Sequence, residues 1–275
     1  MLPGMTLFEL RRLAYGGGFL HGLVNDQDRN LFALHVHGTG GSFYRLTIST
    51  ELAGAYLAAG ADYATVNVPG TGNEAAQEIF AASLPALRAW LAELSRGRDL
   101  ILQGHSLGAA KVMRLLRSAL DLRTRTRAVV LLSPIDLPAL YARSTDESVR
   151  AGKLAATAQA IAAGHGDGLV PAETFELWPV SNRTYAQALE RGGDWDQFPT
   201  ALGSAGVLAD WTTPTMVVLG GQDFAAQPDA RAVAGLLREQ APQLRTEFLP
   251  DGLHSFQGHE PVVADLVADF LRSTL

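Results

Sequence analysis

Short apolar runs alternate with longer amphipathic stretches along most of the chain. The runs, which predict buried strands, occupy residues 31–36, 62–68, 99–103, 128–132, 214–219 and 244–249. Apolar positions at helical spacing predict helices over residues 44–59, 74–95 and 261–271, and another helix from residue 109. Strands that alternate with helices in this way are typical of a doubly wound, mostly parallel sheet with helices on both faces.

This alternation is interrupted twice. Near the start, two short alternating stretches at residues 6–10 and 19–24 flank three consecutive glycines, which predicts an antiparallel hairpin. From about residue 136 to residue 211, Ala-rich helical stretches and loop-rich segments replace the strands. We therefore predict an α/β core formed by residues 1–135 and 212–275, with residues 136–211 inserted as a helical cap over the strand ends.

One pentapeptide carries a chemical signature. Residues 104–108 read Gly-His-Ser-Leu-Gly and stand between an apolar strand and a helix. A strand that turns sharply into a helix raises the central side chain, here Ser106, above the sheet edge. Because a serine hydroxyl is a weak nucleophile at neutral pH, the pattern predicts catalysis only if the chain also supplies a base, an orienting acid and an oxyanion pocket.

The base and the acid have candidates near the C-terminus. His254 lies in a loop between the last predicted strand and the final helix, from which its Nε2 could take the serine proton and return it to a leaving group. Asp223 follows the strand at 214–219 through two glycines and is the predicted acid. Asp136, just after the strand at 128–132, is an alternative acid.

Two backbone N–H groups are the predicted oxyanion donors. One belongs to Leu107, directly after Ser106, and the other to Thr39 in the glycine-rich segment that follows the strand at 31–36. Gly38 and Gly40 are alternatives to Thr39, because either neighbour could present its N–H to the same oxygen. The segment does not match a phosphate-binding loop, since no Lys-Ser or Lys-Thr pair follows it.

Composition narrows the possible partners. The chain has 275 residues, of which 47% are hydrophobic and 18% charged, and its net charge of −6 argues against nucleic acid or an anionic membrane surface as a partner. The basic cluster over residues 123–127 is interpreted as a solvated connection between elements.

The same counts bear on cofactors and location. Cysteine is absent, and no group of histidines and carboxylates has metal-ligand spacing, so we expect no metal and no cofactor. No apolar run approaches the ~20 residues that span a bilayer, and the first residues lack a leader pattern, so a cytoplasmic location is expected.

Taken together, these motifs resemble the α/β-hydrolase superfamily. The resemblance rests on residues 37–41, 104–108, 221–223 and 254–256. The chain order Ser106, Asp223, His254 is also the order of that superfamily. The resemblance implies the α/β-hydrolase fold with a catalytic serine. Residues 179–183 and 192–198 resemble in addition a group of microbial hydrolases related to siderophore esterases.

The resemblance and the residues together predict a cofactor-independent serine hydrolase. It would cleave a small-molecule ester, thioester or lactone through an acyl-enzyme, as carboxylic-ester hydrolases do. The alternative is a lyase, acyltransferase or cyclase on the same fold, in which the cap excludes water. Aromatic residues of the cap either line an apolar pocket or pack the cap on the sheet: Phe175, Trp178, Tyr185, Trp195 and Phe198.

Overall fold

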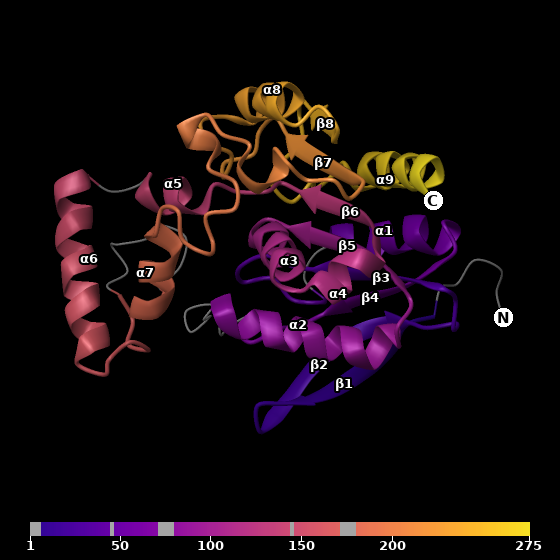
Figure 1. Cartoon of the computed structure of the whole chain (residues 1–275), viewed down its shortest axis with the longest axis horizontal. Coiled ribbons are helices and arrows are strands. Elements are labelled where there is room, and N and C mark those ends of the chain that lie inside the picture. The colour runs from indigo at the N-terminus through magenta and orange to yellow at the C-terminus, as the bar shows by residue number, and fades with distance from the viewer. Residues whose placement is uncertain (1–6, 45–46, 71–79, 144–145, 171–179) are drawn as a thin grey trace.

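A single mixed sheet organises the chain (Figure 1). The computed structural model describes residues 7–44, 47–70, 80–143, 146–170 and 180–275. Within these ranges eight strands pair in the order β1-β2-β4-β3-β5-β6-β7-β8. The first two pairings, β1 with β2 and β2 with β4, are antiparallel, and the others are parallel. The predicted doubly wound, mostly parallel sheet is thereby confirmed.

The strands are β1 (Glu9–Tyr15), β2 (Gly18–Asn25), β3 (Leu31–Val36), β4 (Ala61–Val66), β5 (Asp99–His105), β6 (Thr126–Leu132), β7 (Thr215–Gly220) and β8 (Arg245–Leu249). The helices that flank the sheet are α1 (Thr47–Ala58), α2 (Phe80–Ser95), α3 (Leu107–Ser118), α4 (Leu120–Arg125), α8 (Ala230–Gln240) and, after the last strand, α9 (Glu260–Thr274).

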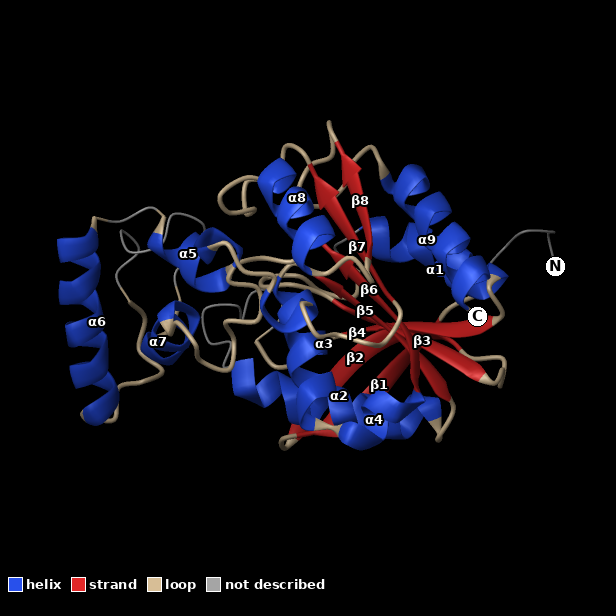
Figure 2. Ribbon diagram, turned by 45° about the horizontal axis from the view of Figure 1, so that its top comes forward, coloured by secondary structure: helices blue, strands red, loops and turns tan. Residues whose placement is uncertain are grey.

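Helices cover both faces of the sheet (Figure 2). On one face α1 and α9 share an apolar cluster with Ile101 and Val130, and on the other α2, α3 and α8 share a cluster with Leu100 and Leu102. Successive side chains of a strand point to opposite faces. The continuous apolar run of β5 therefore contributes to both cores, as is typical of a strand buried on both sides.

The sequence located most elements but not all. β3 occupies the predicted residues 31–36, whereas β1 extends to Tyr15 and pairs with β2 along its whole length. Half of β1 is exposed, so polar residues such as Arg11 and Arg12 weaken its hydrophobic signal. The helix α8 was not predicted, although the Asp229 side chain accepts a hydrogen bond from the Ala232 N–H, a helix-start signal.

The basic cluster is more than a solvated connection. Arg125 donates hydrogen bonds to the carbonyl oxygen of Arg98 and to the Ser95 hydroxyl, and Arg127 pairs with Asp99 at 2.8 Å. Charge runs are usually solvated. For Arg125 this interpretation is wrong, because its guanidinium donates to the carbonyl oxygen of Arg98, next to the start of β5.

Between β6 and β7, the helices formed by the described residues project beyond the end of the sheet (Figure 1). They are α5 (Leu137–Ala142), α6 (Glu147–Ala162) and α7 (Asn182–Leu189), followed by the short η3 (Thr200–Leu202) and η4 (Gly206–Leu208). Of the aromatic residues considered as pocket lining, Tyr185, Trp195 and Phe198 are buried in the same apolar cluster as α3, while Phe175 and Trp178 lie outside the described residues. In the described ranges, no helix is both long and apolar enough to cross a membrane.

Candidate active site

Ser106 lies at a strained turn. It is the one residue between the end of β5 and the start of α3, and its φ of 57° and ψ of −126° are unfavourable for a residue with a Cβ. The turn is held by its backbone: the Ser106 N–H donates to the Leu132 carbonyl at 2.9 Å, and the Ser106 carbonyl accepts from the Ala109 N–H at 2.9 Å. A Cβ at Gly108 would collide with the carbonyl oxygen of Val36, so glycine is required there.

His254 and Asp223 meet in a direct hydrogen bond. The His254 Nδ1 lies 2.7 Å from Oδ1 of Asp223, whose side chain is fully buried. Because a carboxylate accepts, Nδ1 carries the proton and the Nε2 of a neutral ring keeps its lone pair. The loops that carry the two residues also touch, since the N–H groups of Gly221 and Gln222 donate to carbonyls of Leu249 and Gly252.

The Asp223 carboxylate is stabilised in its ionised form. Burial, the largest single influence, raises its pKa, but the hydrogen bond and the charge of His254, the Ala225 N–H and the Ser133 hydroxyl all lower it and together outweigh burial. The net pKa of Asp223 therefore lies below its usual range. Ser133, buried at the end of β6 with a φ of 46°, was not singled out by the sequence, where a serine after a strand is unremarkable.

Asp136 has a different role. Its Oδ1 accepts from the Ala139 N–H at the start of α5 and pairs with Arg191 at 2.7 Å, while Oδ2 accepts from the Ala201 N–H. Of the two carboxylates that the sequence left open as the acid, Asp223 is thus the one bonded to His254. Asp136 instead joins α5 to the segment around η3.

The inserted segment is also fastened to the turn that carries Asp223. Arg143, which follows α5, donates to the carbonyl oxygen of Phe224. The Thr200 hydroxyl in η3 donates to the carbonyl oxygen of Gln227 at 2.7 Å. Two points of the turn at residues 223–227, here called the acid turn, are therefore held by residues from the segment between β6 and β7.

The glycine-rich segment after β3 lies against Ser106. A Cβ built on Gly38 would lie 2.7 Å from the Ser106 Cβ and 3.1 Å from its Oγ. The Gly38 carbonyl is held by the Gly41 N–H and by Nδ1 of His37, at 3.2 Å and 2.9 Å. Thr39 follows directly, and Leu107 occupies the first turn of α3, where backbone N–H groups have no partner within the helix. Gly38, the residue before Thr39, thus lies against Ser106, and Leu107 follows Ser106 directly in the chain.

His105 is a site residue that the sequence analysis missed. It occupies the variable position of the pentapeptide, yet its ring is buried and its Nε2 lies 2.8 Å from the carbonyl oxygen of His254. This contact joins residues 149 positions apart and places the loop of His254 beside the turn at Ser106. The sequence alone offered no signal for this role, because the pattern allows any residue at this position.

Substitution of Gly38 tests how closely the segment approaches Ser106. In Gly38→Ala the new methyl must displace either Ser106 or the segment, and we expect kcat/KM for a nitrophenyl ester to fall about 100-fold, the cost of misplacing a reacting group by about 1 Å. Gly54→Ala is the matched control, because a Cβ there meets nothing within 4 Å. Equal activity of the two variants would contradict the close approach.

Buried histidines make the fold sensitive to acid. Burial lowers the pKa of His105 to about 4 and that of His37 to about 3, against about 6.5 in the unfolded chain. Below pH 6.5 the unfolded state therefore binds more protons than the folded state, and the free energy of unfolding decreases as pH falls. Each histidine contributes a slope of about 1.4 kcal/mol per pH unit between these values.

Urea unfolding at pH 7, 6 and 5 measures this slope. We expect His37→Gln to reduce it by one histidine's share, whereas Gly54→Ala, which removes no titratable group, leaves it unchanged. A free energy of unfolding that stays constant from pH 7 to pH 5 would argue against neutral buried rings.

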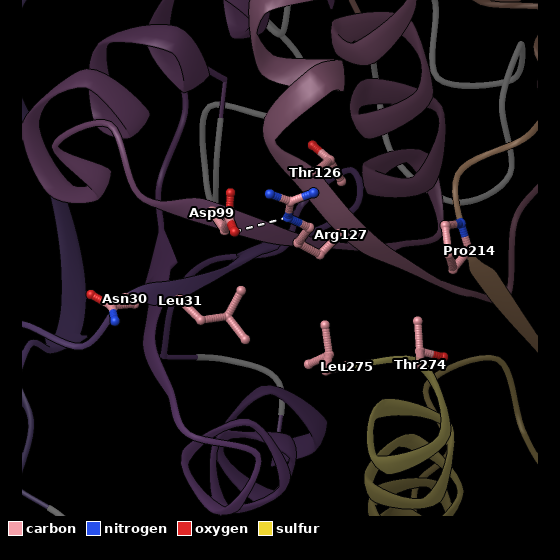
Figure 3. Close-up of a pocket in the computed structure, with 8 residues that line it drawn as sticks. All are labelled: Asn30, Leu31, Asp99, Thr126, Arg127, Pro214, Thr274 and Leu275. Atoms are coloured by element: carbon pink, nitrogen blue, oxygen red, sulfur yellow. Dashed lines mark hydrogen bonds and ion pairs between the residues drawn. The ribbon is translucent and has the colours of Figure 1, made fainter.

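A depression lies at the edge of the sheet opposite to Ser106 (Figure 3). It has a volume of about 470 Å³ and is lined by residues at the amino ends of β3, β5 and β6, before β7, and at the chain end: Asn30, Leu31, Asp99, Thr126, Arg127, Pro214, Thr274 and Leu275. Its two charged side chains already pair with each other. In the described part of the chain, no three histidine or acidic side chains are grouped as metal ligands.

The sheet order, the serine turn after β5 and the histidine loop after β8 define an α/β-hydrolase fold. Residues 33–266 match the model of the alpha/beta hydrolase family, and the chain belongs to this family. No curated protein sequence matches the chain significantly.

Several solved structures share the fold. Est1E from Butyrivibrio proteoclasticus, with ferulic acid bound, has a TM-score of 0.69 and 16% identity, over 96% of this chain and 98% of that one. A soluble variant of monoglyceride lipase from Saccharomyces cerevisiae has a TM-score of 0.67 and 12% identity, over 98% and 97%. An α/β serine hydrolase without lid from Xanthomonas campestris has a TM-score of 0.58 and 16% identity, over 98% and 96%. The relation to siderophore esterases stays a prediction.

Proposed function

We propose that the protein is a serine hydrolase that cleaves a carboxylic ester, thioester or lactone of a small molecule. Ser106 attacks the carbonyl carbon, His254 takes the hydroxyl proton at Nε2, and Asp223 holds the imidazole and stabilises its charged form. The leaving group takes the proton from His254, and water then cleaves the acyl-enzyme by the same route. The N–H groups of Thr39 and Leu107 stabilise the negative oxygen of the intermediates.

The observation that carries this proposal is the 2.7 Å bond between His254 and Asp223 beside the strained turn of Ser106. A carboxylate bonded to Nδ1 selects the tautomer in which Nε2 accepts a proton. The monoglyceride lipase named above is a lipase by its name, and Est1E binds ferulic acid, a carboxylic acid of the kind that ester cleavage releases; both support ester chemistry here. We further propose that residues 136–211 form a cap, in line with α5 and η3 being fastened to the acid turn.

A fluorophosphonate probe with a nitrophenyl ester assay tests the proposal. We expect one covalent adduct per chain, located on Ser106 by mass spectrometry, and a burst of nitrophenol followed by steady turnover. No adduct on Ser106 would refute the proposal. An adduct on Ser106 without turnover of any ester would instead favour a lyase, acyltransferase or cyclase that excludes water.

A further inference from the structure

His105 links the candidate nucleophile to the candidate base. It precedes Ser106 in the chain, and its Nε2 lies 2.8 Å from the carbonyl oxygen of His254. The imidazole rings of His105 and His254 are tilted at 53° with their centroids 5.0 Å apart. The His105 side chain thus contacts the backbone of His254 and not the ring nitrogens of His254.

The direction of this hydrogen bond follows from its partners. A carbonyl oxygen only accepts, so Nε2 of His105 carries the proton. Nδ1 of His105 is buried and, among the residues that the structure describes, has no hydrogen-bond partner. Burial lowers the pKa of His105 to about 4, so the ring is neutral at pH 7 and holds one proton. A neutral ring with its proton on Nε2 fits these surroundings, which offer one acceptor to Nε2 and, among the described residues, no partner to Nδ1.

The contact supplies a second point of attachment for His254. Asp223 fixes the ring at Nδ1, but one hydrogen bond allows a loop residue to pivot about it. A bond to the carbonyl of His254 fixes the following peptide plane and therefore the start of the side chain. The donor is His105, the residue before Ser106 in the strained turn. The position of His254 is therefore tied directly to the residue next to Ser106.

We propose that His105 is a positioning residue that holds the imidazole of His254 in reach of Ser106 through the Nε2–H donated to the His254 carbonyl. The inference rests on the function proposed for Ser106 and His254. His105 touches neither the substrate nor the reacting atoms; it acts through the backbone of the base.

Two nearly isosteric substitutions separate the hydrogen bond from packing. His105→Gln keeps an N–H donor, whereas His105→Met has a similar length and none. We expect His105→Met to lower the rate constant of fluorophosphonate inactivation about 10- to 100-fold, the scale of a misplaced reacting group, and His105→Gln to restore it to within about fivefold of wild type. His35→Met is the control, because His35 is another buried histidine, bonded to Gln103 and not to the base loop.

Nuclear magnetic resonance gives one readout on the wild type, which does not depend on a variant folding, and a second on the two variants. In wild type at pH 7, the nitrogen-15 shifts of His105 should show a protonated Nε2 and an unprotonated Nδ1. The downfield proton of the His254–Asp223 bond should persist in His105→Gln and broaden in His105→Met.

The outcomes are distinguishable. Equal reactivity of the Gln and Met variants, a loss in His35→Met as large as in His105→Met, or a wild-type His105 protonated at Nδ1 would each overturn the positioning role. Absence of a Ser106 adduct in the wild type would overturn the proposed function itself.

Discussion

Ser106→Ala is expected to lower kcat for ester hydrolysis about 10⁵- to 10⁶-fold and to abolish covalent labelling. The Ser106 hydroxyl is the group that forms the acyl-enzyme. Without this hydroxyl, His254 and Asp223 have no nucleophile to activate. Activity that remains should reflect only the oxyanion donors and substrate binding. Burst kinetics with a nitrophenyl ester and intact-mass analysis after exposure to the probe measure both effects.

Ser106→Gly serves as the matched control for folding. Since Ser106 has a φ of 57°, removal of its Cβ relieves strain of about 1 kcal/mol or more, and this variant should be inactive yet at least as stable as wild type. Retention of labelling in either variant would place the reactive residue elsewhere in the chain.

Asp223→Asn is expected to lower kcat about 10⁴-fold while leaving KM nearly unchanged. An amide can donate to Nδ1 of His254, which shifts the ring proton to Nε2 and removes the lone pair that accepts the serine proton. Because the pKa of Asp223 lies below its usual range, the wild-type carboxylate is ionised throughout the neutral range, and the loss should be as large at pH 8 as at pH 7. Pre-steady-state measurement of the acylation step isolates this effect.

Asp136→Asn is the matched control for the acid. Asparagine still caps α5 through its amide oxygen, but it has no charge to pair with Arg191 and no second oxygen for the Ala201 N–H. The substitution should cost about 1–3 kcal/mol of unfolding free energy and leave kcat within about threefold of wild type. If Asp136→Asn lost the activity and Asp223→Asn kept it, the assignment of the acid would be reversed.

The sequence predicted the elements whose signals are local. The strand β3 was predicted to the residue, since a continuous apolar run predicts a strand buried on both faces. Ser106, Asp223 and His254 each stand in a short pattern after a predicted strand, which explains why they could be selected before any contact was known. The helix α8 was missed because its start signal, Asp229, lies close behind the turn of the acid and was not separated from it.

What the sequence could not supply were contacts made across the fold. Asp136 and Asp223 both follow a strand, and only their partners, a helix start and an imidazole, distinguish them. The bond from His105 to His254 depends on how two loops meet at the sheet edge. The Arg125 guanidinium likewise finds its carbonyl in another element, and a charge run alone does not indicate that.

The bonds from Arg143 and Thr200 to the acid turn constrain how this enzyme could be re-engineered or diversified. A foreign domain spliced between β6 and β7 would leave two carbonyls beside the acid without their donors. Grafts in this region therefore need to retain Arg143 and Thr200, or to supply other donors to the carbonyl oxygens of Phe224 and Gln227.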